Sequence, residues 1–383
     1  GGAGPPPPRR RGAMLSAVVE PLLFPAPEPT YTPTGLEGVL AWLPWPGAVP
    51  LSAGCTAGAA GHVPCLWLPT RGSQCVVMYF HANAEDIGLI VNLLHNLRKE
   101  LAVNVLAIEY PGYGLLKDMP PSESGIYSAA EAALAYLVDE IGITYSQVLL
   151  FGRSLGSSPA LHLAARFPVG GLVLMNPFLS VKAVAEQKVG STLAWLSLGD
   201  TFRNDLFIPG VRSPILMVHG LEDETVPAEH SRRLIELATL SSKKLLVTPH
   251  GMNHNSSMFE NPSFLLLPLS RLLDLPSKGV APTLPKEVFK EPVAAPGGVR
   301  CAPTWPMCGS GCAFPGAKAG GGDLSVPFGE APLGDVRLEP FWPAGGRDPV
   351  AAAAAFAALR GRREPFSAPM AERGGGADVA WKI

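Results

Sequence analysis

A serine in a glycine-flanked turn is the residue of this sequence best suited to act as a nucleophile. Ser154 is the centre of Gly152-Arg-Ser-Leu-Gly156, a G-x-S-x-G pattern. The apolar run 148–151 before it predicts a buried strand, and residues 159–167 after it predict a helix. A strand, a tight turn and a helix in this order would lift the Ser154 hydroxyl clear of the sheet at a helix N-terminus, where negative charge is favoured. The flanking glycines indicate a turn so tight that a Cβ atom on either side would clash.

A serine alcohol is a weak nucleophile, so Ser154 needs a general base, and the base needs a carboxylate that orients it. After a strand–turn–helix nucleophile the expected chain order is the acid first and the histidine second. Asp223 follows a predicted strand and is the acid we expect, with Glu222 and Glu224 as competitors.

The base we expect is His254, in the loop after the last predicted strand. His250 ends that strand four residues earlier and is the alternative. His95 and His162 lie on predicted helices, where core or surface roles suffice for both. Because the carboxyl ends of parallel strands meet at one edge of a sheet, the loops that carry Ser154, Asp223 and His254 should meet there.

An acyl transfer also needs donors for the oxyanion that forms on the substrate. We expect the N–H of Leu155 and an N–H from the loop after residues 76–80, with Asn83 as the residue that supplies it. His81 is expected to hold that loop rather than to take part in the chemistry. Ala82 carries a Cβ atom, so the loop should avoid positive φ there.

Composition excludes several classes of protein. The chain has 383 residues and a net charge of −2, and Arg9–Arg11 is its one basic cluster, so we expect no nucleic-acid partner. No run of 18 apolar residues is present, so no transmembrane helix is expected. Six cysteines without a dense framework indicate a reducing compartment, and we expect a cytoplasmic protein that is peripheral to membranes.

The order of the predicted elements indicates an α/β fold. Apolar strands alternate with predicted helices, which predicts a mostly parallel central sheet with helices on both faces. The predicted strands are 40–43, 63–68, 76–80, 103–110, 148–151, 171–175, 214–220 and 244–248. The predicted helices are 86–101, 122–141, 159–167, 184–198, 227–240 and 263–275.

The predicted organisation has three parts. Residues 1–23 should be disordered, and 24–276 should form one domain in which the long interval 179–213 is a small cap insert. Residues 277–383 hold 14 Pro and 17 Gly, which predicts a mostly disordered tail that the domain does not need. Three of the cysteines lie in this tail without a fourth ligand nearby, so no metal and no cofactor are expected; they are Cys301, Cys308 and Cys312.

Residues 24–275 resemble the alpha/beta-hydrolase superfamily. The resemblance is strongest to its serine-aminopeptidase-like branch, which includes the type 17 protein depalmitoylases and their protist relatives. The matching motifs are, in chain order, FPAPEPTY, FHANAEDIG, NVLAIEYPGYG, PSES, LLFGRSLGSSPA, NPF, HGLEDETVP and GMNHN. Transferred residue by residue, the resemblance implies a catalytic triad of Ser154, Asp223 and His254.

The residues and the resemblance favour a serine hydrolase that cleaves an ester or thioester through an acyl-enzyme. The resemblance implies small molecules or acylated proteins as substrates, protein-palmitate thioesters among them. A serine aminopeptidase is the alternative, but the insert offers few carboxylates for a peptide amine: Glu186, Asp200 and Asp205. A non-catalytic protein of the same fold, with a tail that binds partners, is the second alternative.

Overall fold

The computed structural model describes residues 24–46, 61–189, 201–273 and 281–292. The predictions for residues 1–23, for residues 190–200 of the insert and for nearly all of the tail lie outside the described residues. So do the three tail cysteines. Cys65 and Cys75 are described, and both are buried free thiols.

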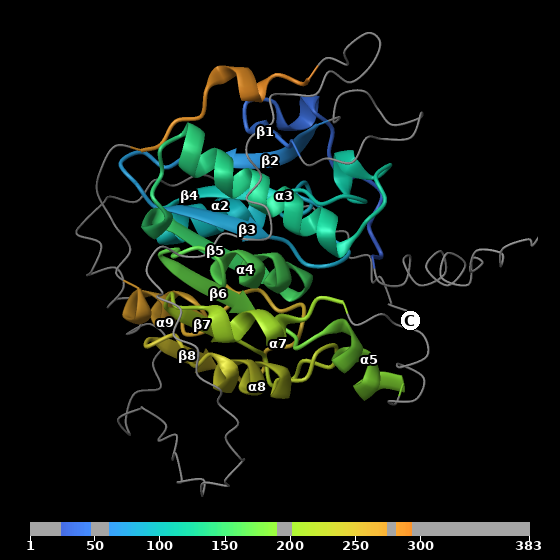
Figure 1. The fold of residues 1–383 in the computed structure, drawn as a ribbon, viewed down its shortest axis with the longest axis vertical. Helices are drawn as coiled ribbons and strands as arrows, with labels where there is room; N and C mark the ends of the chain where they lie inside the picture. Colours follow the sequence, from blue (N-terminus) through green and yellow to red (C-terminus); the bar gives the residue numbers. More distant parts are fainter. Residues whose placement is uncertain (1–23, 47–60, 190–200, 274–280, 293–383) are drawn as a thin grey trace, which may run out of the picture. The chain divides into compact units, whose positions relative to one another are not determined.

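One eight-stranded sheet organises the described part of the chain, in the order β1-β2-β4-β3-β5-β6-β7-β8 from top to bottom of Figure 1. Strand β2 pairs antiparallel with β1 and β4, and every other neighbouring pair is parallel. The strands are β1 (Leu40–Pro44), β2 (His62–Leu68), β3 (Val76–Phe80), β4 (Asn104–Ile108), β5 (Val148–Arg153), β6 (Gly171–Met175), β7 (Ile215–Val218) and β8 (Lys244–Val247). The mostly parallel sheet predicted from the sequence is confirmed.

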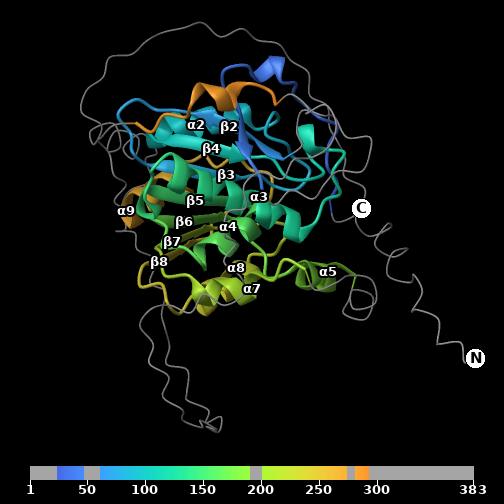
Figure 2. The same ribbon diagram turned by 45° about the horizontal axis from the view of Figure 1, so that its top comes forward.

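Helices cover both faces of this sheet (Figures 1 and 2). One face carries α3 (Glu123–Ala135), α4 (Ser157–Ala164) and α8 (Glu229–Leu237), and the other carries α2 (Val91–Leu101) and α9 (Leu266–Leu272). All residues of the five strands β3 to β7 are consequently buried, which is why they appear in the sequence as continuous apolar runs. The edge strand β8 is only half covered.

Shorter helices and turns complete the described elements. The helices are α5 (Val181–Val189) and α7 (Asn204–Phe207). The short 3₁₀ turns are η1 (Thr34–Leu36), η3 (Gly114–Leu116), η5 (Tyr145–Gln147), η6 (Ser154–Gly156), η7 (Ile208–Gly210) and η8 (Lys286–Phe289), and η4 (Tyr136–Glu140) is a π-helical turn that continues α3. Among the described residues, no helix has the length and apolar character needed to cross a membrane.

The helix predicted from residue 86 begins later, at Val91. Asp86 is buried, and its carboxylate accepts hydrogen bonds from Thr30 N at 2.7 Å and from Leu89 N at 2.8 Å. These bonds hold residues 86–90 in a turn and fasten the lead-in segment to it. The expectation that 86–90 are helical was therefore wrong, because periodicity does not reveal a carboxylate that binds a distant backbone.

A further helix prediction needs correction. The helix expected over 184–198 is described as α5, which begins at Val181 and is followed by residues outside the described part. Residues 204–207 of the insert form the short helix α7. Ser122 caps the start of α3, since its hydroxyl accepts a hydrogen bond from Gly125 N at 3.1 Å.

The packed region continues past residue 276, where the sequence placed the start of the tail. Leu284 is 3% exposed, and Val288 and Phe289 pack against the same core. Turn η8, which follows Leu284, lies against β1. The Pro- and Gly-rich composition of the whole tail concealed this short apolar segment, so the predicted end of the domain is too early.

We predict that residues 281–292 stabilise the domain. Deleting the chain after residue 275 should lower Tm relative to a chain that ends at 292, because the burial of Leu284 alone contributes about 2 kcal/mol of unfolding free energy. That corresponds to a fall of about 4–8 °C for a domain of this size. Thermal unfolding followed by circular dichroism measures it, with Leu284→Ala in the full chain as the matched variant. Equal Tm values for the two shortened chains would contradict this packing.

Candidate active site

Ser154 stands on a strained turn between β5 and α4. Its φ is +49°, a left-handed backbone that a residue with a Cβ atom rarely adopts. The turn is so tight that a Cβ atom on Gly152 would lie 2.3 Å from Gly156 O, and a Cβ atom on Gly156 would lie 2.1 Å from Phe80 O. Both flanking glycines are therefore required by close backbone contact, as the sequence predicted.

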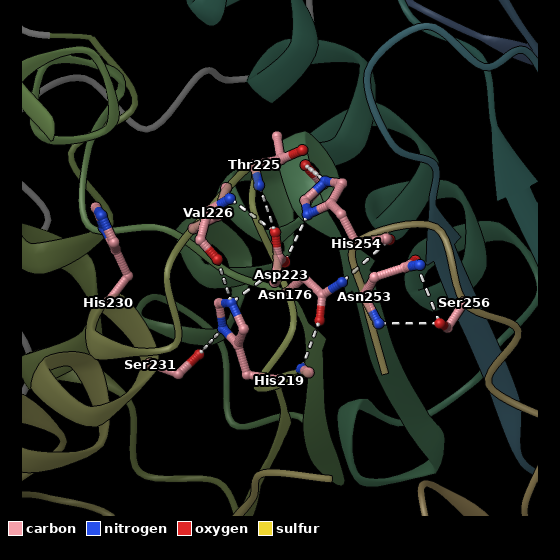
Figure 3. Close-up of polar contacts among 12 residues, drawn as sticks. Asn176, His219, Asp223, Thr225, Val226, His230, Ser231, Asn253, His254 and Ser256 are labelled. Atoms are coloured by element: carbon pink, nitrogen blue, oxygen red, sulfur yellow. Dashed lines mark hydrogen bonds and ion pairs between the residues drawn. The ribbon is translucent and has the colours of Figure 1, made fainter. Parts of the chain in front are cut away.

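The loops after β7 and β8 bring two predicted side chains to Ser154. His254 Nε2 lies 3.0 Å from Ser154 Oγ, and His254 Nδ1 lies 2.7 Å from Asp223 Oδ2. Figure 3 shows His254 pointing towards Asp223. Since a carboxylate only accepts, Nδ1 carries the imidazole proton and Nε2 is left to accept from the Ser154 hydroxyl. The three residues thus form one hydrogen-bonded path.

Asp223 is held in its ionised form by its surroundings. Its Oδ1 accepts hydrogen bonds from Thr225 N at 2.9 Å and Val226 N at 2.8 Å. Burial by itself would raise the pKa of this carboxyl, but hydrogen bonds from His219, His254 and Val226 N outweigh burial and hold the pKa well below its usual range. Asp223 therefore keeps its negative charge next to His254 throughout the neutral range.

A second histidine, His219, also contacts Asp223 and was missed by the sequence reasoning. His219 is fully buried, and its Nε2 lies 2.7 Å from Val226 O and 3.3 Å from Asp223 Oδ2. Both neighbours are acceptors, so Nε2 carries the proton, and Nδ1 accepts from Ser231 Oγ at 2.6 Å. Figure 3 shows this bridge from Asp223 to α8. The only signal in the sequence was the position of His219 at the end of a strand.

The competing residues lie elsewhere. His250 is 89% exposed, and its Nδ1 is 3.7 Å from Glu222, the rival acid, which is itself at the surface. Glu224 is exposed as well. His162, on α4, packs against Tyr127 and Glu131 of α3, which is the core role that the sequence allowed.

The backbone of His254 is fixed by two donors that sequence reasoning assigned no role. Its carbonyl oxygen accepts hydrogen bonds from Arg153 Nη2 and from Asn176 Nδ2, both at 3.1 Å. Asn176 follows β6 and has a φ of +49°, which asparagine tolerates better than most residues. Its Oδ1 accepts from Gly220 N at 3.4 Å, so it joins the loop of Asp223 to that of His254 (Figure 3).

The loop after β3, where the second oxyanion donor is expected, lies beside the turn of Ser154. Gly156 approaches Phe80 O and His81 O so closely that a Cβ there would touch both. Ala82 is not among the described residues with positive φ, as expected, whereas Ala84 has a φ of +58°. Tyr113 donates its hydroxyl hydrogen to Asn83 Oδ1 and thereby fixes the Asn83 side chain.

His81 holds this loop from below, as the sequence predicted. The ring is fully buried, and its nitrogens lie 2.9 Å from Ala82 O and 3.1 Å from Glu109 Oε1. It stacks on Tyr110 with ring centroids 3.9 Å apart. These contacts join the loop to Glu109 and Tyr110, as expected for a residue that holds the loop in place.

Helix α5 belongs to the predicted cap and is tied to α8 by His230. His230 Nδ1 accepts from Leu179 N at 3.1 Å, and Nε2 lies 2.9 Å from Gln187 Oε1 on α5. Burial lowers the pKa of His230 to about 4, so the ring is neutral near pH 7, as this pattern of one acceptor and one donor requires. Figure 3 shows His230 apart from the group around Asp223.

The chain is similar in sequence to known alpha/beta hydrolases. The alpha/beta hydrolase family model matches residues 63–238. Alpha/beta hydrolase domain-containing protein aho-3 of Caenorhabditis elegans is 30% identical over 283 residues, which cover 70% of this chain and 82% of that protein. Human alpha/beta hydrolase domain-containing protein 17B is 29% identical over 195 residues, which cover 51% of this chain and 65% of that protein.

A second type 17 relative and a solved structure agree with these matches. Alpha/beta hydrolase domain-containing protein 17C of Xenopus tropicalis is 31% identical over 184 residues, which cover 48% of this chain and 57% of that protein. The match to the type 17 relatives thus spans about three fifths of their length. The esterase Pf2001 of Pyrococcus furiosus has a TM-score of 0.50 and 15% identity, with 65% of this chain and 95% of that one covered, which shows a shared fold. The chain belongs to the alpha/beta hydrolase family, with type 17 proteins among its relatives.

Proposed function

We propose that this alpha/beta hydrolase cleaves carboxylic esters or thioesters, with Ser154 as nucleophile, His254 as general base and Asp223 as the acid that orients it. The observation that carries the proposal is the hydrogen-bonded path of 3.0 Å from Ser154 Oγ to His254 Nε2 and 2.7 Å from His254 Nδ1 to Asp223 Oδ2. A general base must lie within such reach of the proton that it removes.

In the first half of the reaction, Ser154 Oγ attacks the carbonyl carbon of the substrate while its proton passes to His254 Nε2. Asp223 stays ionised and stabilises the imidazolium. The N–H of Leu155 and that of Asn83 are the proposed oxyanion donors, and one such donor typically contributes about 2.7–4 kcal/mol of transition-state stabilisation. His254 then gives its proton to the departing alcohol or thiol, and an acyl-Ser154 ester remains.

In the second half, water takes the place of the leaving group. It gives a proton to His254 Nε2 as its oxygen attacks the acyl-Ser154 carbonyl, and the collapse of this intermediate returns the proton to Ser154 Oγ and releases the carboxylic acid. No step requires a metal or a cofactor. Within the part of the chain that the structure describes, no group of three His, Cys, Asp or Glu side chains is arranged to hold a metal ion.

The described carboxylates of the insert favour an acyl substrate over a peptide amine. Asp205 forms a bidentate ion pair with Arg203, and Glu186 Oε1 lies 3.9 Å from Lys182 Nζ. Glu85, near Ser154, is paired with Arg153. These carboxylates already have cationic partners, which leaves less negative charge for the amine that an aminopeptidase must bind. Asp200 lies outside the described residues.

We propose that apolar side chains of the insert line a groove for the acyl chain of the substrate. Of the apolar side chains that could line it, Val184 on α5 is described, half-buried and packed against the core. The side chains of Val189, Leu193, Trp195 and Leu196 lie outside the described residues. The resemblance to the type 17 depalmitoylases adds protein-palmitate thioesters to the proposed substrates, and with them action in the cytoplasm at a membrane surface.

Ser154 is predicted to be the residue that reacts covalently. A labelled fluorophosphonate should modify the wild-type chain, and Ser154→Ala should abolish the labelling, because the probe needs an activated hydroxyl beside an oxyanion site. Gel fluorescence followed by peptide mapping measures this. Labelling of another serine would overturn the assignment, and no labelling of the wild type would favour the non-catalytic alternative.

His254 and not His250 is predicted to be the base. His254→Ala should lower kcat for a short-chain ester by about 10⁴-fold or more, as losses of catalytic histidines do. His250→Ala is the matched control and should leave kcat unchanged, because that ring is exposed and 3.7 Å from Glu222. Equal losses in the two variants would mean that the base is misassigned.

The leaving group is predicted to be an alcohol or a thiol. A medium-chain acyl thioester should be hydrolysed faster than an alanyl or prolyl p-nitroanilide, because an amide needs more help with leaving-group protonation and more remote binding energy. The kcat/KM values of the two substrates with the same enzyme decide the matter, with Ser154→Ala as the background control. Faster cleavage of the anilide would favour the aminopeptidase.

A further inference from the structure

A largely buried ion pair next to Ser154 has no part in the path from Ser154 to Asp223. Arg153 Nη1 lies 2.9 Å from Glu85 Oε1, and the two side chains are 10% and 18% exposed. Arg153 is the last residue of β5 and directly precedes Ser154, whereas Glu85 lies in the loop after β3. Because the desolvation of two buried charges offsets most of their attraction, such a pair is a poor source of stability alone.

One further polar atom of each side chain binds another part of the proposed active site. Arg153 Nη2 donates to His254 O at 3.1 Å, and Glu85 Oε2 accepts from Ala82 N at 3.0 Å. One pair therefore joins the nucleophile turn, the loop proposed to hold the oxyanion donor and the loop of the proposed base. Each of these three segments follows a different strand.

We propose that Arg153 and Glu85 act as one positioning unit for the hydrolysis, an inference that rests on the proposed function of Ser154 and His254. Neither side chain reaches the reacting atoms. Arg153 sets the distance from His254 to Ser154 by holding the His254 carbonyl, and Glu85 sets the loop of Ala82 and Asn83 by holding the Ala82 N–H. The ion pair couples the position of the His254 carbonyl to that of the Ala82 N–H.

The chemistry of the two side chains explains why these types stand here. A planar guanidinium can donate to a carboxylate and to a carbonyl in different directions at once, which a lysine ammonium on a flexible stem does less well. A carboxylate has two oxygens, so Glu85 can accept from Arg153 on one and from Ala82 N on the other. Both partners use two separate atoms, and each link in the unit is a charge-assisted hydrogen bond.

Three variants test the unit. Arg153→Met removes the guanidinium while keeping an apolar stem, Glu85→Gln removes the charge while keeping the shape, and the third variant combines both changes. The measurements are kcat and KM for a short-chain ester, taken at a temperature well below the Tm of every variant. Arg166→Met is the matched control, because Arg166 pairs with Glu131 on the surface at 2.7 Å.

Each single variant should lower kcat by about 10–100-fold with KM changed by less than about twofold, since a displacement near 1 Å in a catalytic group can cost that much. The double variant should lose no more than the worse single variant, because the two residues act together. Arg166→Met should match the wild type. If Arg153→Met fails to fold, Glu85→Gln and the double variant, which leaves no unpaired charge, supply the same comparison.

Two results would overturn the positioning unit while leaving the proposed function intact. The first is a kcat within about threefold of wild type in the variants together with a lowered Tm, which is the result of a purely structural role. The second is a double variant whose loss equals the product of the single losses, which would mean independent action. A wild type that neither hydrolyses the ester nor labels with fluorophosphonate would instead refute the proposed function, and the unit with it.

Discussion

The candidate active site depends on one close contact between two backbones. Gly156 sits so near the carbonyl oxygen of Phe80 that no side chain fits between them. This contact brings the start of α4 against the end of β3, and the turn of Ser154 must then take a left-handed φ. Strain of this kind persists only where the surroundings over-determine it. Here the constraint comes from both sides, from β5 before the turn and from α4 after it.

The loop of His254 is less constrained by the sheet than the turn of Ser154, because it follows an edge strand. Strand β8 is the edge strand and is half exposed, and β6 and β7 separate it from β5. Each strand on the way contributes a contact. Arg153 ends β5, Asn176 follows β6, and Gly220 follows β7 and binds Asn176. The loop that carries the proposed base is thus fastened by the strands that it crosses.

Much of the sheet could be predicted from the sequence because buried parallel strands leave an unmistakable pattern. The predicted strand 171–175 matches β6 at both ends, and 76–80 matches β3. The three residues that the structure joins by hydrogen bonds were also candidates from the sequence, because each follows a predicted strand in the expected chain order. The resemblance to the family was needed to favour Asp223 over Glu222 and Glu224.

Contacts between loops could not be predicted, because they depend on the order of strands in the sheet and on side-chain direction. Glu85 and Arg153 are 68 residues apart, and no local pattern marks this pair. His219 and Asp223 are only 4 residues apart in one loop, but whether they meet depends on the direction that each side chain takes. The same reason explains the late start of α2, where Asp86 binds Thr30 across 56 residues. Leu284 was missed because composition averaged over a long tail conceals one apolar turn.

Asp223 combines a structural and a proposed chemical role on its two oxygens. Oδ1 accepts from the N–H groups of Thr225 and Val226 and so shapes its own loop, while Oδ2 faces His254 and, at 3.3 Å, His219. An amide in place of the carboxylate would have to turn its NH₂ group towards one of these sets of donors. If the NH₂ group faced the N–H groups of Thr225 and Val226, the hydrogen bonds that shape the loop would be lost. If it faced His254, the imidazole proton would have to move from Nδ1 to Nε2, and Nε2 could then no longer accept a hydrogen bond from the Ser154 hydroxyl. Only a charged, four-acceptor side chain satisfies both sides, which is why the low pKa of Asp223 and the tautomer of His254 have the same origin.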